Sequence, residues 1–276
     1  MTINDIKPLT SKATYDEMKQ NFDILYMYSE YSEEFLMKLP REYFLSPAST
    51  KYHGSFKSGL IFHSTNVALF TYRNLIEMKK MEVSKYLNDL NDKDFEQYLK
   101  DAVFAGLFHD FCKINVYKNE EDATEKQIEY ALGLCKELNL QSDLFDVMNL
   151  GKSSLSNFIE KAKQLLYDLN NDKVDENTFI KRADELSLIK REYIFQDDFK
   201  IGHGEKSVIM LLRYGVQLTD HQIYAIRFHQ NEMDVLWEIE KERQNILIHT
   251  DKIPMQKSII LAEKISGWLY EKGKDY

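Results

Sequence analysis

Five residues of metal-ligand type stand out in this sequence because each lies in or beside an apolar, helix-like stretch. They are His63, the adjacent pair His109 and Asp110, His203 and His229. An imidazole or a carboxylate is costly to bury unless it binds a partner. Nitrogen and carboxylate ligands that come from separate helices suit one or two divalent ions. The residues therefore predict a metal centre rather than a generic helical core.

Taken one at a time, these residues support the prediction of a metal centre to different degrees. A lone histidine such as His63 on an apolar stripe is more often a core residue than a ligand, and a His-Asp dipeptide is common by chance. His203 lies between two glycines, which allow the backbone close to a ligand. His229 follows Ile226 by three residues, on the inward face of its helix. Neighbours on a helix point about 100° apart, so His109 and Asp110 can share an ion only near a helix end or in a wide site.

The composition favours an all-α fold. The chain has 276 residues, 43% of them hydrophobic, with only ten glycines and four prolines, and its long uninterrupted stretches repeat with a helical period. The net charge of −9 argues against a surface for duplex nucleic acid. Two cysteines are too few for a disulfide framework, which favours a reduced, cytoplasmic setting. We expect no membrane span and no export signal.

The pattern predicts where the helices lie. Helices are expected at about 60–80, 93–112, 206–215, 220–231 and 255–272, and an ordered loop at 43–56, which includes His53. Residues 1–45 are expected to form a helical cap on a main domain at 46–276. The polar stretch at about 119–199, with helical runs at 126–138 and 154–169, is expected to be a helical insertion: a lid, an oligomer contact or an ordinary solvated excursion. His221 and His249 are expected to be structural or surface residues.

Taken in order, the motifs resemble those of the HD-domain metal-dependent phosphohydrolases, and in particular a branch of small enzymes of bacteria and their phages. The segments that carry this resemblance are SPASTKYHG (46–54), GLIFHS (59–64), LFHDFCK (107–113), GHGEKSV (202–208) and AIRFH (225–229). It covers about 43–270, apart from 119–199. The resemblance implies an HD-domain-like helical bundle, with one or two metal ions, in the cytoplasm of a bacterium or of a phage-infected host.

The resemblance also implies how the ligands divide. One ion would be held by His63, His109, Asp110 and Glu263, and a second by Asp110, His203 and His229. The family usually has an aspartate in an Ala-Asp pair on its last helix, where this chain has Ala262 and Glu263. The longer glutamate can ligate from a shifted backbone, bind through both oxygens, or mark a weakened site. So many imidazoles suit Mn²⁺, Fe²⁺, Co²⁺, Ni²⁺ or Zn²⁺ better than Mg²⁺.

The expected activity is hydrolysis of a nucleotide or related small phosphoester, either a phosphomonoester or a cyclic or other phosphodiester, by a metal-activated water. Asp110 and Lys113 are the predicted catalytic residues, and Lys57, Lys206 and Arg227 the predicted phosphate contacts, although surface charge explains the latter as readily. Two alternatives remain open. One is a 3′-to-5′ exoribonuclease on short RNA, and the other is a non-catalytic metal- or nucleotide-binding protein with a degenerate site. A homo-oligomer is possible.

Overall fold

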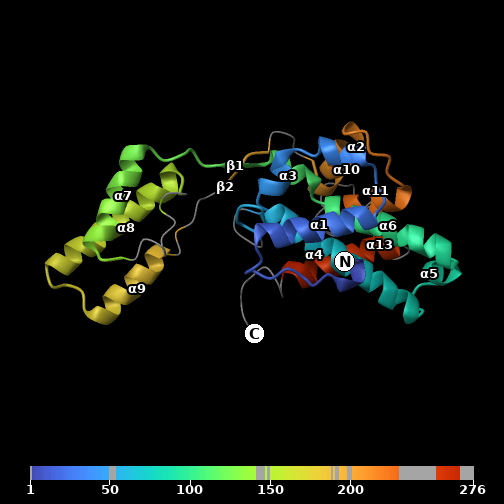
Figure 1. Cartoon of the computed structure of the whole chain (residues 1–276), viewed down its shortest axis with the longest axis horizontal. Helices are drawn as coiled ribbons and strands as arrows, with labels where there is room; N and C mark the ends of the chain where they lie inside the picture. Colours follow the sequence, from blue (N-terminus) through green and yellow to red (C-terminus); the bar gives the residue numbers. More distant parts are fainter. Residues whose placement is uncertain are drawn as a thin grey trace, which may run out of the picture. The chain divides into compact units, whose positions relative to one another are not determined.

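The structure, a computed structural model, describes residues 2–49, 54–140, 147, 150–187, 189, 193–197, 201–229 and 253–267. Its elements, labelled in Figure 1, are in chain order η1 (Ile3–Asp5), α1 (Tyr15–Tyr28), α2 (Glu33–Lys38), α3 (Arg41–Leu45), α4 (Gly59–Lys80), α5 (Lys85–Asp89), α6 (Asp92–Phe108), η2 (Phe111–Asn115), β1 (Tyr117–Asn119), α7 (Glu125–Glu137), α8 (Lys152–Asn170), α9 (Glu176–Ser187), β2 (Tyr193–Phe195), α10 (His203–Arg213), α11 (Asp220–Arg227) and α13 (Pro254–Ile265). The all-α prediction is confirmed: within the described residues the only strands are β1 and β2, which pair with each other.

The chain divides into two compact units. The main unit joins Met1–Tyr117 to Asp197–Tyr276, and the insertion unit is Lys118–Gln196. Residues 1–45, predicted to be a helical cap on the main domain, contribute buried side chains to the same apolar core as α4 and α6. The N-terminal segment is also tied to α4 by the buried amide of Asn66, which bonds to both the N–H and the carbonyl of Leu9.

Helix α4 runs through the middle of the main unit. Its residues 59–72 are all buried, because α1, α6 and α13 pack around it. Its contact with α6 depends on Gly106, since a Cβ atom there would lie 2.7 Å from the Cα of Ala68. Only glycine allows the two helices to come this close. This close contact determines how far apart α4 and α6 lie, and therefore how far apart the side chains on their neighbouring turns lie.

Several predicted helix ends are wrong by a few residues, and all of them lie at the motifs. The helix predicted at about 93–112 ends at Phe108, after which the backbone tightens into η2. The helix expected from about residue 206 already begins at His203, and the one expected to reach residue 231 ends at Arg227. Helix α3 occupies the start of the loop predicted at 43–56. No proline or capping motif marks the ends at Phe108, His203 and Arg227, so the periodicity could not locate them, whereas Pro40 does stand directly before α3.

The insertion unit has an apolar core of its own. Helices α7, α8 and α9 bury mostly aliphatic side chains between them, including Leu134, Leu155 and Phe158. The buried carboxylate of Glu120 caps the start of α8 by accepting hydrogen bonds from the N–H groups of Ser153 and Ser154 at 2.8 and 2.9 Å. In neither unit does the described part of the chain include a helix that is long and apolar enough to cross a membrane.

Candidate metal centre

All six predicted metal ligands converge in the main unit, although they come from distant parts of the sequence. Their ligand atoms form two groups, each within 4.8 Å, and Asp110 belongs to both. The first group is His63, His109, Asp110 and Glu263, and the second is Asp110, His203 and His229. Helix α4 supplies His63 and α13 supplies Glu263, while the remaining four residues stand at the ends of α6, α10 and α11.

The two oxygens of Asp110 face different groups. Oδ2 lies 3.3 Å from Nε2 of His109 and 3.7 Å from Nε2 of His63, whereas Oδ1 lies 3.6 Å from Nε2 of both His203 and His229. Ligand atoms around a single ion are separated by about 3.0–3.4 Å when each lies about 2.1 Å from the metal. The carboxylate therefore lies between the two groups and could offer one oxygen to each.

The imidazoles present lone pairs to the cluster. Nδ1 of His109 lies 2.8 Å from the carbonyl of Gly106, and Nδ1 of His229 lies 2.7 Å from the carbonyl of Ile226. A carbonyl can only accept, so each Nδ1 carries the hydrogen and each Nε2 of the neutral ring presents a lone pair. This is the arrangement that orients histidines toward a metal. His109 Nε2 then faces His63 Nε2 at 3.3 Å, and His229 Nε2 faces His203 Nε2 at 3.0 Å.

A cation is needed to balance these groups. Oε1 of Glu263 lies 2.8 Å from Nε2 of His109, close enough to accept a hydrogen bond whenever that nitrogen carries a proton. Burial disfavours a charged His109, but Asp110 and Glu263 outweigh it and raise the pKa of His109 to about 9. A proton thus occupies the ring when nothing else neutralises the carboxylates. A divalent ion would do the same for the whole cluster, so the residues fit a metal.

In the second group, the surroundings of His203 keep its ring neutral. Burial and the neighbouring His229 lower the pKa of His203 to about 3, so this ring stays neutral and keeps a lone pair available. Burial also opposes ionisation of Asp110, but Lys113 and His109 hold the pKa of its carboxyl well below the usual range. His203 and Asp110 are accordingly in the protonation states that a metal requires, whereas a metal would have to displace the proton from His109.

Lys113 lies against the bridging carboxylate. Its Nζ is 2.5 Å from Oδ2 of Asp110, and its side chain is only 10% exposed. Burial alone would lower the pKa of Lys113, but Asp110 and Tyr117 more than offset it and raise it. The amine is therefore a fixed positive charge beside the cluster. The neighbouring Cys112 differs, because burial raises the pKa of its thiol to about 12 and keeps it protonated.

Aromatic packing holds the His109-Asp110 pair from behind. Phe108 and Phe111 flank the pair in sequence, and both rings pack on the buried ring of Tyr43, with centroids 5.2 and 6.0 Å away. The hydroxyl of Tyr43 donates a 2.5 Å hydrogen bond to the carbonyl of Leu107 at the end of α6. The N-terminal helices thus fix the turn on which the pair stands.

A second close helix contact positions the other two histidines. A Cβ atom at Gly204 would lie 2.4 Å from the carbonyl oxygen of Arg227, so the start of α10 can press against the end of α11 only because residue 204 is glycine. The buried amide of Gln256 donates to the carbonyl of Phe228 at 2.9 Å and ties α13 to the same corner. These contacts set His203 beside His229.

The residues that position the ligands were not predicted from the sequence. Among them, Gly106 could have been recognised from the sequence, because a glycine inside an apolar helical run usually indicates close packing. Tyr43 and Gln256 act through contacts that are distant in sequence, and no local pattern could have revealed them.

The predicted phosphate contacts lie in less specific settings. Lys206 is buried and pairs with Asp197, while Arg227 pairs with Glu205 at 3.5 Å and stacks on the ring of Phe228. Lys57 is exposed. Their contact with a substrate remains a prediction.

The other histidines stand apart from this set. His221, which was expected to be a structural or surface residue, is half-buried and lies 3.0 Å from the hydroxyl of Tyr86, which supports a structural role. His53 and His249 lie outside the described residues.

Solvent reaches the cluster on the side of His203. The side chain of His203 is 30% exposed and that of Glu263 is 13% exposed, while those of His63, His109, Asp110 and His229 are fully buried. His203 is also the first residue of α10, whose N-terminal N–H groups favour an anion at this end. An anion would therefore reach the cluster on the side of His203.

No protein-family model, curated protein or solved structure matches this chain. By its geometry, this buried group of histidines and carboxylates in an all-α bundle can hold a metal ion.

Proposed function

We propose that this protein is a metal-dependent phosphohydrolase of the HD-domain type, which acts on a nucleotide or another small phosphoester. The observation that carries the proposal is the bridging position of Asp110 between two groups of imidazoles. Bound divalent ions would supply Lewis acidity, which lowers the pKa of water and neutralises charge on phosphate oxygens.

The residues of the chain have separate roles in this proposal. His63, His109 and Glu263 would hold one cation, and His203 and His229 the other, with Asp110 shared between them. Lys113 keeps its positive charge at 2.5 Å from Asp110, so it can hold the carboxylate in position and offset charge on a phosphate oxygen nearby. The burial of the other ligands favours entry of the phosphate from the side of His203, where the substrate can displace water without exposing the carboxylates.

The proposal is tested by loading the purified protein with Mn²⁺, Fe²⁺, Co²⁺, Ni²⁺ or Zn²⁺. Each form is then offered nucleoside monophosphates, cyclic nucleotides, dinucleotides and short RNA. We expect steady turnover of one of the small phosphoesters, which a chelator abolishes and the same metal restores. Turnover confined to short RNA would instead support the exoribonuclease alternative. Stoichiometric metal without any hydrolysis would support the non-catalytic alternative and overturn the proposal.

Lys113 provides a sharper test of the chemistry. Lys113→Met keeps the length of the side chain but removes its charge, so the turnover rate should fall by about tenfold or more. Lys113→Arg should recover part of this loss, because the charge returns. A rate that is equal in both variants and the wild type would remove Lys113 from the mechanism.

A further inference from the structure

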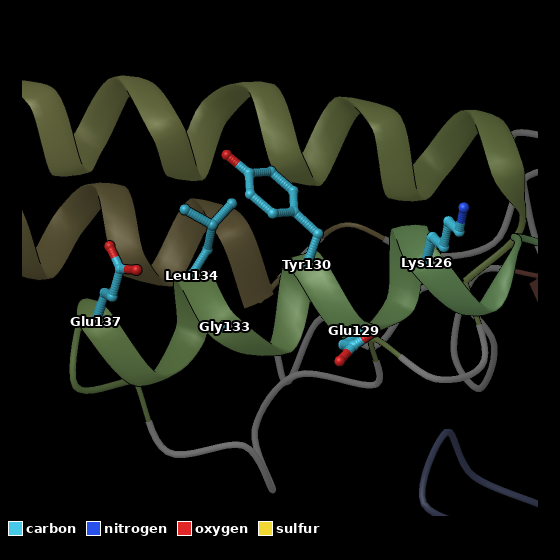
Figure 2. A pocket seen from close by; sticks show the side chains of 6 residues that line it. All are labelled: Lys126, Glu129, Tyr130, Gly133, Leu134 and Glu137. Carbon is cyan, nitrogen blue, oxygen red and sulfur yellow. The ribbon is translucent and has the colours of Figure 1, made fainter.

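One face of helix α7 in the insertion unit packs against no other described element and has an unusual composition. A hollow of about 410 Å³ is lined, among the described residues, by α7 alone. Its lining residues, labelled in Figure 2, are Lys126, Glu129, Tyr130, Gly133, Leu134 and Glu137. The apolar core of the unit lies on the side of α7 that carries Ala131, Cys135 and Leu138, and Leu134 borders both the core and the hollow. Among the described residues, the hollow therefore lies beside the packed core and not within it.

Gly133 forms the floor of this hollow, in the middle of the helix. A Cβ atom there would meet nothing within 4 Å in the described structure. Glycine weakens a helix interior relative to alanine, and close packing within the described residues does not explain it here. Beside it, the ring of Tyr130 is 50% exposed. A large exposed ring next to an open glycine is a typical arrangement for one helix receiving the side chain of another.

The polar residues of this face are arranged symmetrically. Lys126 lies four residues before Tyr130, and Glu137 lies four residues after Gly133. At about 100° per residue all four lie within about 60° of one another around the helix. The four residues have the same spacing in both chain directions. When the direction is reversed, Glu137 takes the position of Lys126 and Gly133 takes the position of Tyr130.

We infer that α7 binds α7 of a second copy of this chain, with the two helices antiparallel. In that register Lys126 of each copy lies opposite Glu137 of the other, and Tyr130 of each copy lies opposite Gly133 of the other. The arrangement has twofold symmetry, so one contact surface supplies both sides of the interface. Each ion pair and each ring contact forms twice.

The charges of this face do not serve the monomer. Lys126 and Glu137 are exposed, and neither forms an ion pair among the described residues. Eleven residues of helix separate them by about 16 Å, which is too far for an ion pair within one helix. A parallel pairing would set like charges against each other, and only the antiparallel pairing sets opposite charges together. The charges therefore select a second copy in this orientation as the partner.

The inference is tested by charge exchange in the full chain, with sedimentation velocity across micromolar to submillimolar concentrations. Wild type should dimerise. Lys126→Glu alone and Glu137→Lys alone should each raise the dissociation constant by about tenfold or more, because each creates two like-charge pairs. The double variant should return to within about threefold of wild type, since the pairs are restored with their signs exchanged. Lys161→Glu, an exposed change on α8, is the matched control and should dimerise as wild type does.

Gly133→Gln gives a second, independent readout. The open space around Gly133 should tolerate the side chain in the monomer, so the helical signal should melt at an equal or higher temperature while the dimer is lost. A chain that stays monomeric at the highest concentration overturns the inference. So does a dimer that all of these variants leave unchanged, because the interface would then lie elsewhere.

Discussion

The two units bury polar groups in different ways. In the insertion unit, buried polar side chains such as Glu120 and Asp168 sit at helix ends or edges, and each has a partner that stabilises the local fold. In the main unit His63, His109 and Asp110 are completely buried, and Nε2 of His63 faces Nε2 of His109 at 3.3 Å. Such an arrangement costs stability unless a ligand completes it. The difference separates residues that the fold needs from residues that a bound cation needs.

The largest expected effect is that of Asp110→Asn. The amide has nearly the same shape, but it loses the charge shared by both groups, so metal content should fall at both positions and hydrolysis should drop by at least about a hundredfold. Elemental analysis and initial rates measure both quantities on one preparation. Wild-type activity in this variant would mean that the reaction does not use the cluster.

Two glycine substitutions sharpen the comparison between the units. Gly106→Ala forces a Cβ atom toward Ala68 and should destabilise the main unit by about 1–3 kcal/mol, with weaker metal binding as His109 shifts from His63. Gly133→Ala meets open space and should stabilise α7 by up to about 1 kcal/mol. Hydrogen exchange of peptides from α6 and α7, at a dilution where the chain is monomeric, reports each unit. Equal destabilisation by both changes would contradict the packing described for α4 and α6.

Glu120→Gln should affect the insertion unit without affecting the metal centre. The buried carboxylate accepts two N–H groups at the start of α8, so the neutral amide should cost about 1–2 kcal/mol. Glu121→Gln is the matched control, because Glu121 is 79% exposed and pairs only with Lys152 at the surface. Exchange rates in α8 should rise in the first variant alone. Metal content should be the same in both.

The smallest effect is a pH dependence of the insertion unit. Hydrogen bonds from Arg182 and Gln164 hold the pKa of Asp168 below its usual value. Because the folded-state pKa is the lower one, this contribution to stability is complete above about pH 4 and is lost as the pH falls further. Asp168→Asn should therefore flatten the acid side of the stability profile of α8 and α9. An unchanged slope would mean that the Asp168–Arg182 pair does not stabilise the unit.

The positions of the helices could be predicted from the sequence better than the residues at which they end. The ligands could be predicted better than the contacts that position them. Apolar periodicity revealed the centre of α4 and α6, because burial imposes a helical spacing on the side chains. The turn at His109 and Asp110 was missed, since it is stabilised by Tyr43, more than sixty residues away. Single histidines were ambiguous by themselves. Only contacts between α4, α6, α10, α11 and α13 make them a cluster, and such contacts leave no local pattern.

The most direct test of the metal centre is anomalous diffraction from crystals of the full chain soaked in Mn²⁺. We predict one peak within about 2.5 Å of Nε2 of His63 and His109, and a second within the same distance of Nε2 of His203 and His229, with one oxygen of Asp110 on each. Occupancy at both positions should fall together in Asp110→Asn crystals. Well-ordered wild-type crystals without a peak at either position, at a Mn²⁺ concentration that saturates exposed carboxylates, would contradict the account.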